Sequence, residues 1–363
     1  MKKTLALILA LIMCLSLFAA CGSGDTAPAD TSKPADTSKP ADTKAPEAEA
    51  SYSADKPLVI RYGHNSTATT DAQYIYAELF KAEVEAATEG RIIVEVYPGS
   101  QLGAVTEMVD MIKNGTLDMM STDFANLQVY LPDAGVFSAP YTFKSAQHAV
   151  DATNPEKSEA MQLINEQLID IAGIRFLGGF YRGARQLTCN FPVYGPEDIA
   201  GVKIRGVAAD LWNVMLEGMG AVPTSIDFSE LATSLMTNVV EGQENPLNSI
   251  LDGKLYEAQD YCMITSHMYS VLCFPFNDAK WNAMTAEDQA IVQGIINDIC
   301  AKSVEEGLAY EEESRVKLEE LGMTFITEED GLDNAAFQAG VQAKLAEAYP
   351  EWTKYIEMFE AMD

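Results

Sequence analysis

GVKIRGVAADLWNVMLEGMGAVPTSIDFSELATSLMTNVVEGQENPL, residues 201–247, is the stretch of the chain that decides the fold. Its apolar and β-branched runs predict strands over residues 202–205 and 239–242, and the sequence between them has the pattern of helices. Strands that alternate with helices are typical of α/β domains whose sheet is largely parallel. Because open sheets of this kind bind ligands at the carboxyl ends of their strands, the stretch also predicts a ligand site.

The same alternation continues in both directions from this stretch. Upstream, the patterns predict helices over residues 71–87 and 105–113, and strands over residues 58–63, 91–99, 116–121, 174–179 and 186–189. Downstream, residues 286–321 contain few helix breakers and predict one or two long helices, which could span two domains. Two α/β domains in one chain usually place a ligand in the cleft between them.

Composition narrows the classes of function. The 363 residues are 48% hydrophobic and 21% charged, which is enough apolar material for two folded domains. The 54 acidic and 24 basic residues give a formal net charge of -30, and a surface of this sign repels nucleic acid. Three histidines and no CxxC pair supply few metal ligands. We therefore expect no nucleic-acid partner, no metal and no cofactor.

The N-terminus predicts export from the cytoplasm. Lys2 and Lys3 precede an apolar run over residues 5–18 that ends in small residues, as in a signal peptide. The segment FAAC, residues 18–21, resembles a bacterial lipobox, and the resemblance implies cleavage before Cys21 and lipid attachment to its thiol. Residues 1–20 would then be a lipoprotein signal peptide, and the protein would be anchored on the outer face of the cell membrane or in the periplasm. An ordinary secretory signal is the alternative.

A low-complexity linker is predicted after the cysteine. Residues 21–57 contain mainly Pro, Ala, Asp, Thr, Ser and Lys, with PADTSK occurring twice, and offer almost no apolar side chain to a core. A flexible chain of this length has a reach of roughly 30 to 40 Å. We expect it to tether a globular body, starting at residue 58, to the membrane.

Neither the cysteines nor the histidines indicate catalysis. Beyond the linker the cysteines are Cys189, Cys262, Cys273 and Cys300, which allow three disulfide pairings or four free, buried thiols. The chain contains no HExxH, GxSxG or GxGxxG motif. We interpret the three histidines, His64, His148 and His267, as hydrogen-bonded structural residues, and we assign no catalytic residue.

The arginines are more informative. Three of the seven, Arg182, Arg185 and Arg205, fall within 24 residues, in or beside predicted strands. A guanidinium can hold a carboxylate by two parallel hydrogen bonds, which lysine cannot do. Composition alone favours salt bridges to the abundant acidic residues, whereas the surrounding motifs favour an anionic ligand.

The motifs identify a family. The block over residues 201–247 resembles the DctP-type solute-binding proteins of tripartite ATP-independent periplasmic (TRAP) transporters, and the similarity covers nearly everything after residue 57. The other matching segments are YPGSQLG (97–103), NGTLDM (114–119), LPDAGVFSAPY (131–141), GARQLT (183–188), KLYEAQDY (254–261) and SH (266–267). Each fragment is weak alone, but their order and spacing together are specific.

The resemblance implies a two-domain, periplasmic-binding-protein-like α/β fold with a ligand cleft between the domains and a long helix that spans both. Domain I would comprise residues 58–182 plus 271–310, and domain II residues 183–270 plus 311–363. The implied function is capture of a small organic acid and its delivery to the membrane subunits of a TRAP permease.

The resemblance also implies a set of binding residues. The carboxylate-binding arginine of the family falls on Arg205 in KIRG, a second pocket arginine on Arg185 in GARQ, and an asparagine that reaches the carboxylate on Asn245 in GQENP. For Trp212 we favour a place in the core, whereas for Glu244, as for Glu230, capping a helix or pairing with a lysine stays an open alternative.

Four further residues complete the implied pocket. Phe228 in DFSE matches an aromatic wall, and Asn65 in YGHNS a polar group from the opposite domain. Asp123 falls where some members carry an acidic residue that accepts hydrogen bonds from ligand hydroxyls. Asn126 stands where some sialic-acid binders carry another arginine, which argues against sialic acid.

Alternatives stay open on the sequence alone. An ABC-type solute-binding lipoprotein would have the same tether and cleft, and a secreted enzyme acting on sugar acids would need Asp123 as its base. A sensor component or an adhesin is a third class. C4-dicarboxylates, sugar acids and hydroxy acids all suit one arginine anchor, and Asp123 leans towards a hydroxylated ligand because it would repel a second carboxylate.

Overall fold

A computed structural model describes residues 51–362. The predicted signal peptide, the lipidation site Cys21 and most of the predicted linker lie outside the described residues. Within the described range, no helix is both long enough and apolar enough to cross a membrane.

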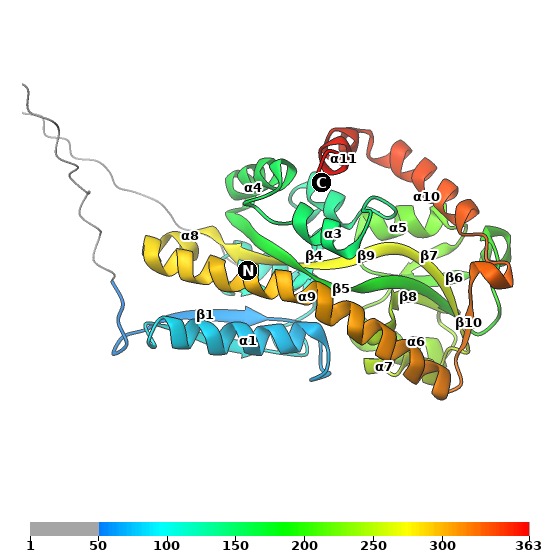
Figure 1. Ribbon diagram of the computed structural model, residues 1–363, viewed down its shortest axis with the longest axis horizontal. Helices are drawn as coiled ribbons and strands as arrows, with labels where there is room; N and C mark the ends of the chain where they lie inside the picture. Colours follow the sequence, from blue (N-terminus) through cyan, green and yellow to red (C-terminus); the bar gives the residue numbers. More distant parts are fainter. Residues whose placement is uncertain (1–50, 363) are drawn as a thin grey trace, which may run out of the picture. The chain divides into compact units, whose positions relative to one another are not determined.

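Over the described residues, the centre of the fold is one mixed sheet of ten strands (Figure 1). The strands are β1 (Leu58–Gly63), β2 (Ile92–Tyr97), β3 (Met119–Met120), β4 (Thr122–Asp123), β5 (Ile174–Cys189), β6 (Lys203–Gly206), β7 (Val222–Ser225), β8 (Gly242–Pro246), β9 (Tyr261–Asn277) and β10 (Thr324–Ile326). Their order is β2-β1-β3-β9-β5-β8-β6-β7, and β4 and β10 also pair with β9.

Helices cover the sheet and connect its strands. The α-helices are α1 (Ala72–Ala87), α2 (Val105–Lys113), α3 (Ala146–Ala152), α4 (Glu159–Ala172), α5 (Asp210–Gly218), α6 (Phe228–Met236), α7 (Leu247–Asp252), α8 (Asp278–Asn282), α9 (Ala286–Glu320), α10 (Asn334–Ala348) and α11 (Thr353–Glu360). Two short 3-10 helices matter for the site, η1 (Phe124–Leu127) and η2 (Pro132–Ser138).

The fold has two lobes that share two long strands. The first lobe contains β1–β4 with α1–α4, and the second contains β6–β8 with α5–α7. The first-lobe strands β3 and β4 pair with the end of β9, whereas β8 pairs with the end of β5. Strands β5 and β9 pair along their whole lengths and therefore run through both lobes.

The prediction of a largely parallel sheet is wrong at the centre. Strand β5 is antiparallel to β8 and β9, and only the pairs β1–β2, β1–β3, β6–β7, β6–β8 and β9–β10 are parallel. The reason is topological, because β5 leads into the second lobe and β9 leads back out of it, so the two run in opposite directions.

Strand β5 also replaces two predicted strands with one. The patterns indicated separate strands over residues 174–179 and 186–189, but the chain continues between them through irregular pairing near Gly178 and Gly183. Both glycines have positive φ, +143° and +129°, which side chains disfavour. Strand β8 begins at Gly242, where the predicted strand over residues 239–242 ends.

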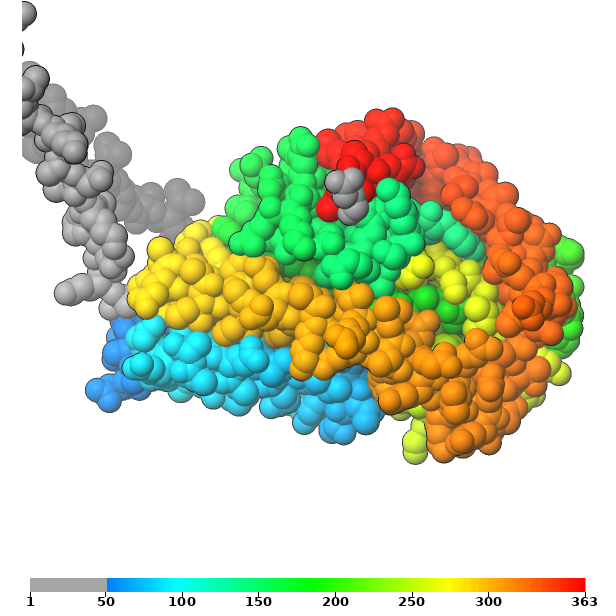
Figure 2. Space-filling model, viewed as in Figure 1, coloured from blue at the N-terminus to red at the C-terminus, as the bar shows by residue number. Residues whose placement is uncertain are grey.

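The long helix is confirmed. Helix α9 has 35 residues and begins after Thr285, whose side chain accepts a hydrogen bond from the Asp288 backbone N–H. At 1.5 Å per residue it is about 50 Å long. It packs on α1 of the first lobe, on β5, and on α7 of the second lobe, and Figure 2 shows it as a continuous yellow-to-orange band across one face.

The body begins earlier than the predicted boundary at residue 58. Tyr52 is buried, and its hydroxyl donates to Asp288 Oδ2 at 2.5 Å and accepts from the Thr285 backbone N–H at 3.1 Å. Tyr52, an aromatic residue in an otherwise polar stretch, therefore joins the segment before β1 to the start of α9.

The C-terminal segment crosses back to the first lobe. Helix α10 packs against α5, but Phe359 of α11 packs on the rings of Phe137 and Phe143. His148 Nε2 also lies 2.8 Å from the Phe359 carbonyl oxygen. The prediction assigned all of residues 311–363 to domain II, and the residue-by-residue division into domains stays a prediction.

The four described cysteines, Cys189, Cys262, Cys273 and Cys300, are free and buried. Burial raises the pKa of each thiol above its ordinary value, so the unreactive protonated form is favoured. Of the alternatives that the sequence left open, the structure therefore has the free thiols.

Candidate functional site

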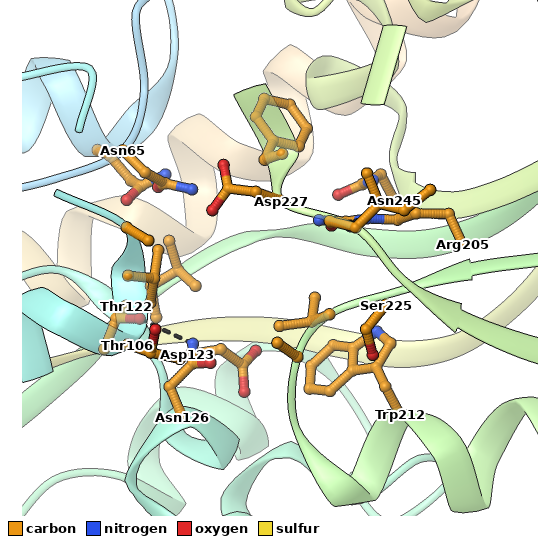
Figure 3. Close-up of a pocket in the computed structure, with 18 of the residues that line it drawn as sticks. Asn65, Thr106, Thr122, Asp123, Asn126, Arg205, Trp212, Ser225, Asp227 and Asn245 are labelled. Carbon is orange, nitrogen blue, oxygen red and sulfur yellow. Dashed lines mark hydrogen bonds between the residues drawn. The ribbon is translucent and has the colours of Figure 1, made fainter. Parts of the chain in front are cut away.

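A cavity of about 280 Å³ lies between the two lobes, and it is lined by all seven residues of the predicted pocket. Asn65, Asp123 and Asn126 come from the first lobe, and Figure 3 shows them on the side opposite to Arg205 and Asn245. The remaining predicted residues, Arg185 and Phe228, line the cavity from β5 and from the start of α6.

Strand ends explain why these residues meet. Asn65 follows the end of β1, Asp123 ends β4, and Arg205 is the penultimate residue of β6. Carboxyl ends of neighbouring parallel strands share one edge of a sheet, which is where open α/β folds bind ligands. Asp227 caps α6 by accepting a hydrogen bond from the Ser229 backbone N–H, and this turn brings Phe228 to the cavity.

Arg205 has no carboxylate partner among the described residues. It is 3% exposed, and its Nε donates to the Ile226 carbonyl oxygen at 2.9 Å. Its guanidinium carbon lies 6.0 Å from the centre of the Phe228 ring. Burial lowers its pKa to about 10, so the side chain is still a cation at neutral pH. Among the described residues, Arg205 is therefore a buried positive charge that faces the cavity with no carboxylate in ion-pair contact, although Glu244 and Asp227 raise its pKa from farther away.

Arg185 is bound differently. Its guanidinium makes a two-pronged ion pair with the Glu244 carboxylate, with Nη2 at 2.8 Å from Oε1. Nη2 also donates to the Glu244 carbonyl oxygen at 2.8 Å and to Asn245 Oδ1 at 3.1 Å. Arg185 thus lines the cavity, as predicted, but its charge is already balanced within the protein.

Glu244 is the acid of this ion pair, and the alternative that it caps a helix or pairs with a lysine is wrong. Its fully buried carboxylate accepts hydrogen bonds from Arg185, from Trp212 Nε1 at 2.7 Å, and approaches His267 Nε2 at 3.0 Å. Burial alone would raise its pKa, but Arg185 and His267 outweigh burial and hold the pKa at about 2. Glu244 is therefore ionised.

Asn245 belongs to the same network. Its Oδ1 accepts from Arg185, and its Nδ2 lies 2.5 Å from Gln243 Oε1. These contacts fix the orientation of the Asn245 amide, which lines the cavity.

Asp123 presents an unused acceptor to the site. Its Oδ1 accepts from the Ala125 backbone N–H at 2.9 Å and from Ser138 Oγ at 2.5 Å. Its Oδ2 is buried and has no hydrogen-bond partner among the described residues. Burial raises the pKa of this carboxyl above its ordinary value. Nearby, Asn126 Nδ2 donates to Thr122 Oγ1 at 2.9 Å.

Several residues that line the cavity were not predicted from the sequence, and two of them, Trp212 and Arg182, matter most for its charge. Trp212 is buried, as expected for a core residue, but it also lines the cavity and donates to Glu244. Arg182 lines the cavity as well, although it was given no role. The only signal for Arg182 was its place in the arginine cluster, because residues 182 and 185 of a regular strand point to opposite faces.

The histidines divide into two groups. His148 and His267 are hydrogen-bonded structural residues, as predicted. His64 is buried too, but neither ring nitrogen has a partner among the described residues, so that part of its interpretation is wrong. Burial lowers the pKa of His64 to about 4 and keeps the ring neutral. Over residues 51–362, no group of three or more His, Cys, Asp or Glu side chains is arranged to hold a metal ion.

Known sequences similar to this chain are solute-binding proteins. Residues 62–351 match the family model DctP, described as bacterial extracellular solute-binding protein, family 7. A solute-binding protein of Roseobacter denitrificans is 34% identical over 304 residues, which cover 83% of this chain and 90% of the relative. The 2,3-diketo-L-gulonate-binding periplasmic protein YiaO of Escherichia coli is 27% identical over 281 residues, which cover 77% and 83%.

Solved structures of TRAP solute-binding proteins have the same fold as this chain. The crystal structure of a TRAP periplasmic solute-binding protein from Roseobacter denitrificans with bound L-galactonate matches with a TM-score of 0.76 at 31% sequence identity. The match covers 84% of this chain and 98% of that one. These similarities favour the TRAP-type family over the ABC-type alternative.

Proposed function

The chain belongs to family 7 of the bacterial extracellular solute-binding proteins, the DctP family of TRAP transporters, and we propose that it captures a sugar acid in the cleft and delivers it to a TRAP permease. The observation that carries the proposal is Arg205, a buried guanidinium that faces the cavity without a counter-ion among the described residues. A ligand carboxylate would supply the missing charge through two parallel hydrogen bonds.

The proposed ligand class is supported from two directions. The relative from Roseobacter denitrificans was crystallised with L-galactonate, and the relative from Escherichia coli is named for 2,3-diketo-L-gulonate. In this chain, the opposite wall of the cavity offers Asn65, Asn126 and Asp123, which are side chains that hydrogen-bond hydroxyl groups. A monocarboxylate with several hydroxyls therefore suits both walls.

Delivery requires that loaded and empty protein differ. A ligand held by Arg205 on one side and by Asn65 or Asp123 on the other contacts both lobes, and only such contacts favour a closed form over an open one. We propose that the permease recognises the closed form, that the ligand leaves chemically unchanged, and that the protein is not an enzyme. We also propose that lipid on Cys21 holds the protein outside the cytoplasmic membrane, which the mass of the N-terminal peptide would test.

The carboxylate clamp is tested by substitution. The purified protein is screened by thermal shift against organic and sugar acids, because a ligand that binds only the folded state raises the Tm. For the best ligand, Arg205→Ala is expected to weaken binding by about 2 to 5 kcal/mol, which is roughly 30-fold to several thousand-fold in Kd. Arg205→Lys should also bind weakly, because a point charge replaces the planar fork.

Arg315→Ala is the matched control, because Arg315 lies on α9 outside the cavity, and within the described chain its one ion-pair partner is Glu319 of the same helix, with its guanidinium over the Phe325 ring. It should bind as the wild type does. Unchanged affinity in Arg205→Ala would contradict the clamp, and chemical conversion of the recovered ligand would contradict the proposal of a binding protein.

A further inference from the structure

Arg182 is a buried cation whose hydrogen-bonding capacity is unused. The residue is 8% exposed and lines the cleft, yet its side chain makes no hydrogen bond to any described residue, and its Nε is buried without a partner. Its nearest carboxylate oxygen is Asp71 Oδ2, at 3.6 Å from Nη2, which is beyond hydrogen-bond distance. A guanidinium carries five N–H donors, and buried donors of a folded protein nearly always have acceptors.

The three cleft arginines differ in how much they can still bind. Arg185 uses its Nε and Nη2 on Glu244 and Asn245, and Arg205 uses its Nε on the Ile226 carbonyl oxygen. Arg182 uses none within the described part of the chain. Among the described residues, Arg182 is therefore the cleft guanidinium with the most unused donors, and its charge, unlike that of Arg185, is not neutralised by a hydrogen-bonded carboxylate.

An irregularity in β5 brings Arg182 to this position. Tyr181 pairs with Val271 and Gly183 with Ser270, so Arg182 is an extra residue with no partner in β9. Such a bulge redirects the side chain and allows Arg182 and Arg185 to line the same cavity. Gly183 makes the bulge possible, because its φ is +129° and a Cβ there would lie 2.8 Å from the Cβ of Pro246.

The complementary group is Asp123. Within the described chain, its buried Oδ2 has no donor and the Arg182 guanidinium has no acceptor, and the two residues line the same cavity. Burial lowers the pKa of Arg182, while Asp71, Asp123 and Asp252 act in the opposite direction, so the guanidinium already has carboxylates in its surroundings. A second carboxylate on the ligand would be repelled by these carboxylates. A hydroxyl can accept from Arg182 and donate to Asp123 at once.

We propose that Arg182 is a specificity-determining residue that, together with Asp123, binds ligand hydroxyls and selects polyhydroxylated monocarboxylates. The inference rests on the proposed function, because Arg205 must hold the carboxylate. Arg205 then provides the charge that every acid shares, and Arg182 provides the discrimination between sugar acids and simple acids.

The test compares two acids that share a carboxylate end but differ in hydroxyls, L-galactonate and glycerate, by titration calorimetry. Arg182→Met keeps the apolar length of the side chain and removes its donors. It is expected to weaken L-galactonate roughly 10- to 100-fold, the loss expected for hydrogen bonds to a charged group, and glycerate less than threefold. Asp123→Asn should show the same selectivity, and the double variant should lose less than the product of the single losses.

Arg315→Met is the matched control, because it makes the same change at a guanidinium that lies outside the cavity. It should bind L-galactonate within threefold of the wild type. If Arg182→Met binds L-galactonate as the wild type does, the proposal is overturned. Arg182 would then be hydrated from a second cavity of about 460 Å³, which it also lines. Equal losses for the two acids would overturn it as well, in favour of a structural role.

Arg205→Ala, measured alongside, separates this inference from the proposed function. If Arg205→Ala loses both acids while Arg182→Met loses neither, the clamp stands and the role of Arg182 fails. If the wild type binds neither acid, or Arg205→Ala binds both as the wild type does, the proposed function fails first.

Discussion

Glu244 determines how much positive charge the cleft offers to a ligand. Three arginines line the cavity, and Glu244 balances one of them, Arg185, through a fully buried ion pair. The charge that is left for an anionic ligand resides mainly on Arg205, because Asp71 Oδ2 lies 3.6 Å from Nη2 of Arg182. The overall charge of -30 repels anions at long range, so attraction acts only within about one Debye length, roughly 8 to 10 Å.

Glu244→Gln is expected to destabilise the fold. The substitution leaves the guanidinium of Arg185 buried without its counter-ion, and breaking a buried pair in this way costs about 3 to 5 kcal/mol. Urea unfolding at pH 7 measures the loss. Glu217→Gln, on the exposed face of α5, is the control and should be neutral. A change below about 1 kcal/mol for Glu244→Gln, at the low end for a lost hydrogen bond, would contradict the ion pair.

The same carboxyl predicts an acid dependence. Its pKa is lowered in the fold from 4.5 to about 2, so its contribution to stability is fully present above pH 4.5 and is lost as the pH falls towards 2. The stability gap between wild type and Glu244→Gln should therefore narrow between pH 5 and pH 2. A gap that stays constant over this range would show that Glu244 titrates alike in the folded and unfolded chains.

Much of the site could be predicted from the sequence, and the omissions have physical causes. Arg205 and Asn245 lie in contiguous motifs, so their place in the cavity followed from the resemblance. The pairing of Glu244 with Arg185 brings together residues 59 positions apart, which no local pattern encodes. Arg182 lines the cleft because β5 has a bulge at this residue. In a regular strand, its side chain would point to the face opposite to that of Arg185.

At the scale of elements, glycines allow α9 to lie close to β5. A Cβ at Gly307 would be 2.8 Å from Cδ1 of Tyr181, and a Cβ at Gly178 would be 3.3 Å from the sulfur of Cys300. Side chains at these positions would hold the helix away from the strand that both lobes share. The close approach of α9 and β5 thus depends on single glycines in each element.

Two glycines of α9 should respond to alanine in opposite ways. Gly307→Ala is expected to cost about 1 to 3 kcal/mol, because the added methyl group meets the Tyr181 ring. Gly294→Ala should stabilise by about 0.5 to 1 kcal/mol, because its Cβ has nothing within 4 Å and alanine is the better helix former. Thermal unfolding of both variants measures the contrast. A lower Tm for Gly294→Ala than for Gly307→Ala would refute this packing.

Elements with strong periodicity were predicted well, and those that depend on tertiary pairing were not. The bounds of β1 and α2 agree with the sequence patterns, and α9 ends within one residue of its prediction. Strand β9 has 17 residues but was not predicted, because its pattern of apolar and polar residues is irregular around Ser266. Its pairing with β5, 72 or more residues away along the chain, is what makes it a strand.

At the scale of the whole molecule, the two shared strands and α9 connect the lobes behind the cavity. The cavity takes residues from the first lobe, from the second lobe and from β5. A ligand that satisfies Arg205 in the second lobe and Asp123 in the first would therefore stabilise one relative position of the lobes. This is the property that a binding protein needs if a membrane partner is to distinguish its loaded form.

The central claim is that Arg205 anchors a ligand carboxylate in this cavity. The most direct test is a crystal structure of the protein with the acid that raises its Tm most. We expect both carboxylate oxygens to lie within about 3 Å of the Arg205 guanidinium nitrogens, with the hydroxyls directed towards Asp123 and Arg182. A carboxylate bound elsewhere, with Arg205 still unpaired, would contradict it.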